Sequence, residues 1–340
     1  MKAVIIPSAG SVAVTDIQKP VMGADEVLLK LHYVGFCGSD LNTFRGGNAM
    51  AKSNVIPGHE IGAVIEAVGA AVPSHLKPGM KVTVNPYTNC GVCSSCRNGR
   101  PNACRNNETL GVQRDGAMRE YISLPWTKII PAETLSLKEC ALVEPMSVGF
   151  HAVSRAAVTD TDTVMVIGCG MVGLGAIVRS VLRGATVIAA DIDDEKLAIA
   201  KSMGAGYALN TLSERFSDEL REITAGHGPD VIIEAVGSPA TYQMAVNEVA
   251  FTGRVTCIGY SKSDVTFQTR LFVQKELDIR GSRNAMPMDF EAVIKYLGRG
   301  TCPVEKLISD VIRPEDAQKT MEYWSANPGK VFRILVDFSL

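Results

Sequence analysis

The residues with the most specific chemistry are four cysteines on one short segment, NCGVCSSCRNGRPNAC, which ends at Cys104. They are Cys90, Cys93, Cys96 and Cys104, and they follow the pattern C-x2-C-x2-C-x7-C. Four thiolates on a loop rich in Gly, Pro and Asn can form a tetrahedral shell around zinc. Because all four coordination positions would then be filled, this zinc would hold the loop in place and take no part in catalysis.

An iron–sulfur cluster and disulfide bonds are the alternatives for these cysteines. The bacterial iron–sulfur pattern continues with x3-C-P, whereas the last gap here has seven residues and no proline follows Cys104. Disulfides need an oxidising compartment, but the start MKAVIIPSAG has one lysine and an apolar run too short for a secretory signal. The other five cysteines are scattered. We therefore predict a structural zinc site in a cytoplasmic protein.

A second motif, Gly168-Cys-Gly170-Met171-Val172-Gly173, is G-x-G-x-x-G. It follows an apolar strand and opens a helix-like stretch, which is the setting of a dinucleotide-binding turn. The first glycine permits the tight turn, the second lets the backbone approach the pyrophosphate, and the third lets helix and strand pack closely. The start of the helix, with Met171 and Val172, offers free N–H groups and a positive dipole end to phosphates.

Asp191 ends the next apolar strand, 18 residues past the last glycine of this motif. Its carboxylate would accept hydrogen bonds from both hydroxyls of the adenosine ribose and would repel a 2′-phosphate. The next residue is Ile192, not a phosphate-binding arginine, so the sequence favours NAD over NADP. The alternative is that Asp191 only caps the following helix, expected at 193–203.

The elements that position these residues differ between the two halves of the chain. The first ~145 residues read as short β-rich segments separated by Gly and Pro, which predicts an irregular, mostly β domain. Later, apolar strands alternate with helix-like stretches, as in a doubly wound parallel sheet. These strands are expected at 163–168, 187–191, 230–236, 253–259 and 276–282. Val236 and Gly259 end two of them and complete the predicted cofactor site.

The last segments of the chain suggest a return to the first domain. DFEAVIKYLGRG reads as a helix, and KVFRILVDF reads as a strand that could rejoin the β domain. We therefore predict that residues 1–147 and 289–340 form one domain and that residues 148–288 form the inserted nucleotide-binding domain.

Three further motifs could hold a second metal: GFCGSD with Cys37, PGHE with His59 and Glu60, and VEP with Glu144. Thiolate, imidazole and carboxylate are the ligands that zinc prefers. Each residue alone also has an ordinary structural explanation. His59-Glu60 does not begin H-E-x-x-H, because position 63 is alanine. Spacing alone therefore gives only a weak metal hypothesis.

Taken in order, GFCGSD, GHE, the four-cysteine loop, the EP motif and G-x-G-x-x-G resemble the zinc-dependent medium-chain dehydrogenases over essentially the whole chain. ALVEPMSVGFHA is similar to the sorbitol and polyol dehydrogenase branch. KELDIRGSRNAMPMDF resembles bacterial dehydrogenases of sugar acids and sugar alcohols, including the L-galactonate and galactitol-phosphate types. The resemblance implies an α/β protein, with a GroES-like irregular β catalytic domain and a Rossmann domain. It also implies two zinc ions per chain, NAD, and a homodimer or homotetramer.

By position, the resemblance makes Cys37 and His59 direct ligands of a catalytic zinc, with Glu60 and Glu144 sharing the remaining positions directly or through water. Ser39 would hydrogen-bond the substrate hydroxyl and begin a proton relay. Some relatives end this relay on a histidine five residues after the cysteine.

That relay position is Asn42 in this chain, and an amide cannot take the proton. The proton would therefore leave through Glu60 or through water. Arg283, after the last predicted strand, could bind a substrate carboxylate bidentately, although a surface or subunit-interface role is the alternative.

The implied reaction is the reversible, NAD-dependent oxidation of a secondary alcohol in a sugar acid or polyol. An L-threonine 3-dehydrogenase-type activity on amino alcohols is the second possibility. A non-catalytic, cofactor-binding regulator would show degenerate zinc ligands, and the ligands here are intact.

The composition limits the partners. A net charge of −2 does not indicate binding to nucleic acid or to an acidic membrane surface. No stretch reaches the ~18 apolar residues of a membrane span. Small molecules and other copies of the chain remain as expected partners.

Overall fold

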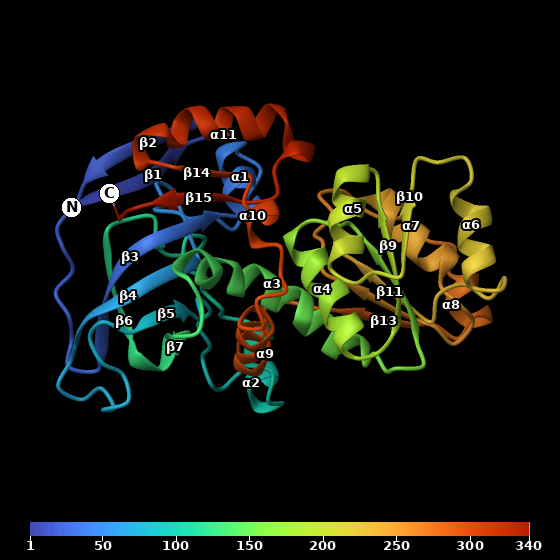
Figure 1. Ribbon diagram of the computed structural model, residues 1–340, viewed down its shortest axis with the longest axis horizontal. Helices are drawn as coiled ribbons and strands as arrows, with labels where there is room; N and C mark the ends of the chain where they lie inside the picture. Colours follow the sequence, from blue (N-terminus) through green and yellow to red (C-terminus); the bar gives the residue numbers. More distant parts are fainter. Residues whose placement is uncertain (340) are drawn as a thin grey trace. The chain divides into compact units, whose positions relative to one another are not determined.

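The computed structural model describes residues 1–339, and their contacts divide the chain into two units (Figure 1). The first unit contains Met1–Glu144 and the chain from Met286 on, and the second contains Pro145–Ala285. The boundaries predicted from sequence lie three residues later at both crossings. The first crossing falls at Pro145, inside one continuous helix, α3 (Leu137–Ala156), which runs through both units.

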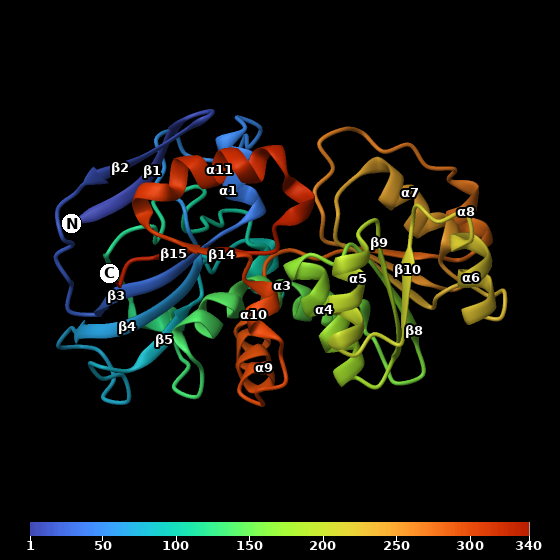
Figure 2. The same ribbon diagram turned by 45° about the horizontal axis from the view of Figure 1, so that its top comes forward.

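The first unit is built on a seven-stranded sheet. Six strands follow the order β14-β15-β3-β4-β5-β7, and the seventh, β6, also pairs with β3. The strands are β3 (Glu26–Phe36), β4 (Glu60–Val68), β5 (Lys81–Val84), β6 (Tyr121–Pro125), β7 (Ile129–Pro131), β14 (Asp310–Ile312) and β15 (Ile334–Asp337). The late strand β15 pairs antiparallel with β3, as Figures 1 and 2 also show. The C-terminal strand therefore completes the sheet that the N-terminal segment begins.

Shorter elements cover this sheet. A separate antiparallel hairpin joins β1 (Lys2–Ser8) to β2 (Ser11–Asp16). The helices of this unit, besides the first part of α3, are α1 (Gly38–Phe44), α2 (Ser94–Arg97), α9 (Pro287–Leu297), α10 (Val304–Leu307) and α11 (Ala317–Ala326). Helix α11 packs against β2 and α1 (Figure 1). The core beneath them is aliphatic and includes Leu29, Leu31 and Ile61, all buried.

The second unit is a six-stranded sheet with the order β10-β9-β8-β11-β12-β13, and every pair is parallel. Its strands are β8 (Thr163–Ile167), β9 (Thr186–Asp191), β10 (Tyr207–Asn210), β11 (Val231–Glu234), β12 (Arg254–Cys257) and β13 (Asp278–Gly281). Its helices after α3 are α4 (Met171–Leu182), α5 (Asp194–Ser202), α6 (Phe216–Ile223), α7 (Pro239–Glu248) and α8 (Arg270–Gln274). This order is the 3-2-1-4-5-6 order of a Rossmann sheet, so the predicted α/β fold class is confirmed.

Helix α3 departs from the strands and turns expected for the first ~145 residues. Nearly every residue from Cys140 to Val153 is buried, so the segment lacks the polar face that usually identifies a helix. Pro145 lies inside the helix, where proline is normally a helix breaker. Within the described residues, no helix has the length and apolarity needed to cross a membrane.

Candidate metal centres and cofactor site

The four-cysteine loop forms a compact cage of sulfur atoms around the short helix α2. The Sγ atom of Cys93 lies 3.5 Å from that of Cys96 and 3.8 Å from that of Cys104, and the Sγ atoms of Cys104 and Cys90 are 3.6 Å apart. Four sulfurs at ~2.3 Å from one tetrahedral zinc ion lie about 3.8 Å from each other. The cage therefore fits a structural zinc ion. The backbone N–H of Cys90 donates to Cys104 Sγ at 3.3 Å, which also fits a thiolate shell.

A second group of possible ligands arises from the register of β3 and β4. Gly35 on β3 pairs with Glu60 on β4, so Cys37 and His59, which flank that pair, are brought together. The ligand atoms of Cys37, His59 and Glu60 all lie within 4.8 Å of one another. A Cβ on residue 35 would lie 2.2 Å from Glu60 Oε2, so only glycine leaves room for this carboxylate.

The electrostatics of this group favour a thiolate. Burial would raise the pKa of Cys37, but the charge and the hydrogen bond of His59 bring it below its usual value. Burial would lower the pKa of His59, yet Cys37 and Glu144 hold it well above 6.5. Thiolate is the form of cysteine that binds metal. The Nδ1 atom of His59 is buried without a hydrogen-bond partner, as expected for a group that pairs with an ion. These donors fit zinc.

Glu60 is completely buried and is held by an arginine that the sequence did not suggest. Arg333, just before β15, places Nη1 2.8 Å from Glu60 Oε1 and also donates to the carbonyl oxygen of Phe36 at 2.6 Å. Burial raises the pKa of Glu60 well above its ordinary value, against the opposing charge of Arg333. The other carboxylate oxygen, Oε2, is buried and has no hydrogen-bond partner, so it remains available to a metal.

Glu144, on α3, lies outside the group whose ligand atoms fall within 4.8 Å of one another among the described residues. Its Oε1 atom accepts a hydrogen bond from the buried hydroxyl of Tyr87. Its charge still contributes to the raised pKa of His59, so it borders the group. The structure thus places Glu60 closer than Glu144 to the other two predicted ligands. Tyr87 was not among the predicted site residues, because its only local signal is an aromatic ring just before the cysteine loop.

Helix α1 carries the residues expected to handle the proton. Its N-terminus is fixed by Asp40, whose carboxylate accepts from the backbone N–H of Cys37 at 2.8 Å. The Oγ atom of Ser39 is buried without a hydrogen-bond partner, which suits a hydroxyl that pairs with a bound molecule. Asn42 lies further along the same helix. Asp40 is a buried acid that the sequence analysis did not single out.

In the second unit, the glycine motif forms a tight turn between β8 and α4, and Met171 and Val172 begin the helix. Gly168 has φ +95°, a left-handed conformation, and a Cβ on residue 173 would lie 1.7 Å from the carbonyl oxygen of Gly168. In contrast, a Cβ on residue 170 would meet no protein atom within 4 Å. The turn therefore packs closely on its inner side and leaves open space beside Gly170, which fits a pyrophosphate.

Asp191 ends β9 beside this turn, and its Oδ2 atom accepts from the backbone N–H of Cys169 at 2.7 Å. Asp191 does not cap the following helix, which was the alternative role for its carboxylate. The N-cap of α5 is Asp193, which accepts from the N–H groups of Glu195 and Lys196 at 2.9 and 3.2 Å. The carboxylate of Asp191 is therefore not used as the cap of the helix that follows it.

The carboxyl ends of β12 and β13 open into a cavity of about 570 Å³. Gly259, predicted to bind the cofactor, and Arg283, predicted to bind the substrate, both line it. Tyr242 also lines it and donates to the carbonyl oxygen of Gly259 at 2.6 Å. Val236, on the turn after β11, is 52% exposed. Its N–H donates to Glu234, a buried acid not singled out from sequence.

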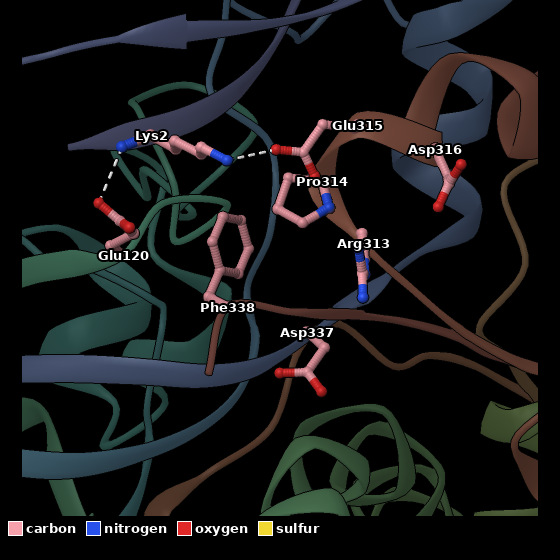
Figure 3. Close-up of a pocket in the computed structure, with 8 residues that line it drawn as sticks. All are labelled: Lys2, Glu120, Arg313, Pro314, Glu315, Asp316, Asp337 and Phe338. Carbon is pink, nitrogen blue, oxygen red and sulfur yellow. Dashed lines mark hydrogen bonds and ion pairs between the residues drawn. The ribbon is translucent and has the colours of Figure 1, made fainter. Parts of the chain in front are cut away.

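A different cavity, of about 420 Å³, lies in the first unit (Figure 3). Charges of both signs line it: the backbone N–H of Lys2 donates to Glu120 at 2.9 Å, and its ammonium group pairs with Glu315 at 2.5 Å. None of its lining residues belongs to either group of possible metal ligands. We therefore assign it no part in the site.

Comparisons with known proteins place the chain in a family. Residues 23–134 match the alcohol dehydrogenase GroES-like domain, and residues 172–299 match the zinc-binding dehydrogenase family. The chain is 34% identical to a sorbitol dehydrogenase of Bacillus subtilis, over 95% of this chain and 93% of the relative. It is 32% identical to an L-galactonate-5-dehydrogenase of Escherichia coli K12, over 85% of each chain.

Solved structures show the same fold. A crystal structure of an alcohol dehydrogenase from Escherichia coli CFT073, complexed with NADH, superposes with a TM-score of 0.90. The two chains are 30% identical, and 99% of each is covered.

Proposed function

The chain belongs to the zinc-dependent medium-chain dehydrogenases, in the branch of sorbitol and sugar-acid dehydrogenases, and from this premise we propose that it oxidises a secondary alcohol of a sugar acid or polyol with NAD. It is an oxidoreductase that acts on CH–OH groups and uses zinc and a nicotinamide cofactor. The observation that carries the proposal is the convergence of Cys37, His59 and Glu60 within 4.8 Å. An intact ligand set argues against a non-catalytic regulator.

In this proposal Cys37, His59 and Glu60 hold the catalytic zinc, and Glu144 borders it. Zinc in this position would supply Lewis-acid chemistry, which favours the deprotonated form of an alcohol. Ser39 contributes a buried hydroxyl with no hydrogen-bond partner, suited to orienting the substrate and accepting its proton. The sulfur cage would hold a second zinc ion, giving two per chain.

NAD is proposed as the cofactor, and it supplies the hydride acceptor when it is bound. The open space beside Gly170 supports a pyrophosphate there. The carboxylate of Asp191, directed at the same turn, supports recognition of an unmodified ribose because it would repel a 2′-phosphate.

The substrate class is proposed as a polyol or aldonate of the L-galactonate type. Two observations support it: the relatives named for L-galactonate and sorbitol, and the place of Arg283 on the cavity that Gly259 also lines. A guanidinium group binds a carboxylate through two parallel hydrogen bonds. Arg283 would therefore distinguish aldonates from hexitols.

A substrate panel tests this assignment. Purified protein is assayed with L-galactonate, hexitols and L-threonine, each with NAD and NADP. We expect turnover with an aldonate or hexitol and NAD, whereas preference for L-threonine would move the assignment to amino alcohols. If an aldonate is used, Arg283→Ala should raise its KM about 10-fold or more and leave hexitol KM unchanged. Arg283→Lys keeps the positive charge but cannot form the two parallel hydrogen bonds of a guanidinium group, so it should give an intermediate KM.

We also propose that the chain forms a homodimer or homotetramer through the edge of the Rossmann sheet. Strand β13 is an edge strand, and Ile279 on it is 46% exposed. An edge strand offers unpaired N–H and C=O groups to a second copy.

A further inference from the structure

The chain enters and leaves the four-cysteine lobe (residues 90–104) through two short segments that pair with each other. Tyr87 and Thr109 form an antiparallel bridge. Next to it, the N–H of Thr88 donates to the carbonyl oxygen of Glu108 at 3.2 Å, and the N–H of Glu108 donates to Thr88 Oγ1 at 2.7 Å. The base of the lobe is thus closed by backbone pairing, and Tyr87 is part of that base.

Tyr87 is fixed at both its backbone and its side chain, and only 5% of the residue is exposed. Its N–H donates to Asn85 Oδ1 at 3.1 Å, and its carbonyl oxygen accepts from Lys128 Nζ at 2.6 Å. The ring meets Phe290 edge-on with centroids 6.3 Å apart. From this position the hydroxyl donates to Glu144. A phenol fixed this firmly determines where the carboxylate can lie.

We propose that Tyr87 is a positioning residue that couples the four-cysteine lobe to the catalytic metal centre by holding Glu144 beside Cys37, His59 and Glu60. This inference rests on the proposed function, because it presumes a metal at those three ligands. It gives the structural zinc a second role: opening the lobe would break the bridge between Tyr87 and Thr109 and let Tyr87, and with it Glu144, shift.

The physical reason is the burial of Glu144, which is 4% exposed. A buried carboxylate that loses one hydrogen-bond donor shifts its position, because the buried oxygen that has lost its donor is costly to leave in place. Groups that hydrogen-bond metal-site residues from outside typically change metal affinity 10- to 100-fold when they are removed. Tyr87 is such a group if Glu144 borders the metal.

The first test is Tyr87→Phe, which keeps the ring and its contact with Phe290 and removes only the hydroxyl. The affinity for zinc is measured by competition with a chromophoric chelator. We expect the affinity for the more weakly held zinc ion to fall about 10-fold or more. The affinity for the tightly held zinc ion should be unchanged. Cobalt(II) exchanged into the weaker site should show shifted visible absorption bands. Tyr323→Phe, the same change on an exposed residue of α11, should alter neither property.

The second test perturbs the lobe. Thr88→Val removes the hydroxyl that accepts from Glu108 and leaves all four cysteines in place. We expect it to lower the affinity for the same zinc ion when it is made alone. In the Tyr87→Phe background it should cause no further loss of affinity. Such non-additivity is the mark of a shared path. Additive losses would show that the lobe acts without Tyr87 and would overturn the coupling.

The outcomes separate this inference from the proposed function. If the parent protein binds two zinc ions per chain and Tyr87→Phe leaves both affinities and the cobalt(II) spectrum unchanged, the positioning role is wrong and the dehydrogenase assignment stands. If the parent protein binds only one zinc ion, the proposed catalytic centre is wrong, and the role of Tyr87 falls with it.

Discussion

At the scale of single residues, the two candidate carboxylates are each held by a partner from a distant part of the chain. Arg333 pairs with Glu60, and Tyr87 donates to Glu144. Buried carboxylates need such partners because an unpaired buried charge is costly. The partners also make the two glutamates different. Glu60 has a buried oxygen without a hydrogen-bond partner next to Cys37, which makes it the better third ligand.

Cys37→Ser tests the catalytic metal centre directly. A neutral hydroxyl replaces a thiolate ligand, so we expect the zinc content to fall by one ion per chain and turnover to fall roughly 100-fold or more. Metal analysis of the purified protein and steady-state kinetics measure both effects. Cys302→Ser, at a cysteine in neither group of ligands, is the control and should keep both values. Full activity of Cys37→Ser without the second zinc would refute the mechanism.

Asp191 and Asp193 are neighbours with separable tasks. Asp191→Ala should weaken NAD binding about 10-fold, because it removes a charged acceptor of hydrogen bonds, and should bring the affinities for NAD and NADP closer together. Asp193→Ala should leave the ratio of these affinities unchanged but lower the free energy of unfolding by about 1 kcal/mol, because it removes the N-cap of α5. Fluorescence titration and urea unfolding distinguish the two. If the ratio of NAD affinity to NADP affinity were the same in the parent protein and in both variants, Asp191 would not belong to the cofactor site.

At the scale of elements, the glycine turn makes a sharp distinction between two glycines three residues apart. Gly173→Ala places a methyl group 1.7 Å from the carbonyl oxygen of Gly168. We expect the free energy of unfolding to fall by about 1–3 kcal/mol, because helix and strand must move apart. Gly170→Ala meets no protein atom within 4 Å, so its stability should stay near that of the parent while its NAD affinity falls. A large loss of stability in Gly170→Ala would contradict an open phosphate site.

Local pattern was enough to predict most strands of the Rossmann sheet. A central parallel strand such as β9 is buried on both faces, and it reads as a continuous apolar run bounded by polar residues. Strand β10 was not predicted, because it is a short edge strand in which only Leu209 is buried. Helix α3 was missed because its burial on all sides removes the helical period from the sequence.

The candidate ligands themselves were recognisable as motifs, but what holds them was not. The pairing of Gly35 with Glu60, the ion pair with Arg333 and the bond from Tyr87 each join segments far apart in the chain. Such contacts depend on sheet register and topology, which a single sequence does not display. The candidate metal ligands could therefore be predicted from the sequence, but not which of the two carboxylates lies nearer to the metal.

At the scale of the whole molecule, the exposed edge of the Rossmann sheet bears on assembly. Strand β13 has no partner strand on one side, and a second copy in antiparallel register would pair with it there and cover Ile279. Ile279→Lys should therefore lower the oligomeric state measured by analytical ultracentrifugation, because pairing would bury the added charge. Tyr207→Lys, on the opposite edge strand β10 and similarly exposed, is the matched control and should leave assembly unchanged. If only the β10 variant dissociated, copies would associate through the other edge, and a monomeric parent protein would refute edge pairing altogether.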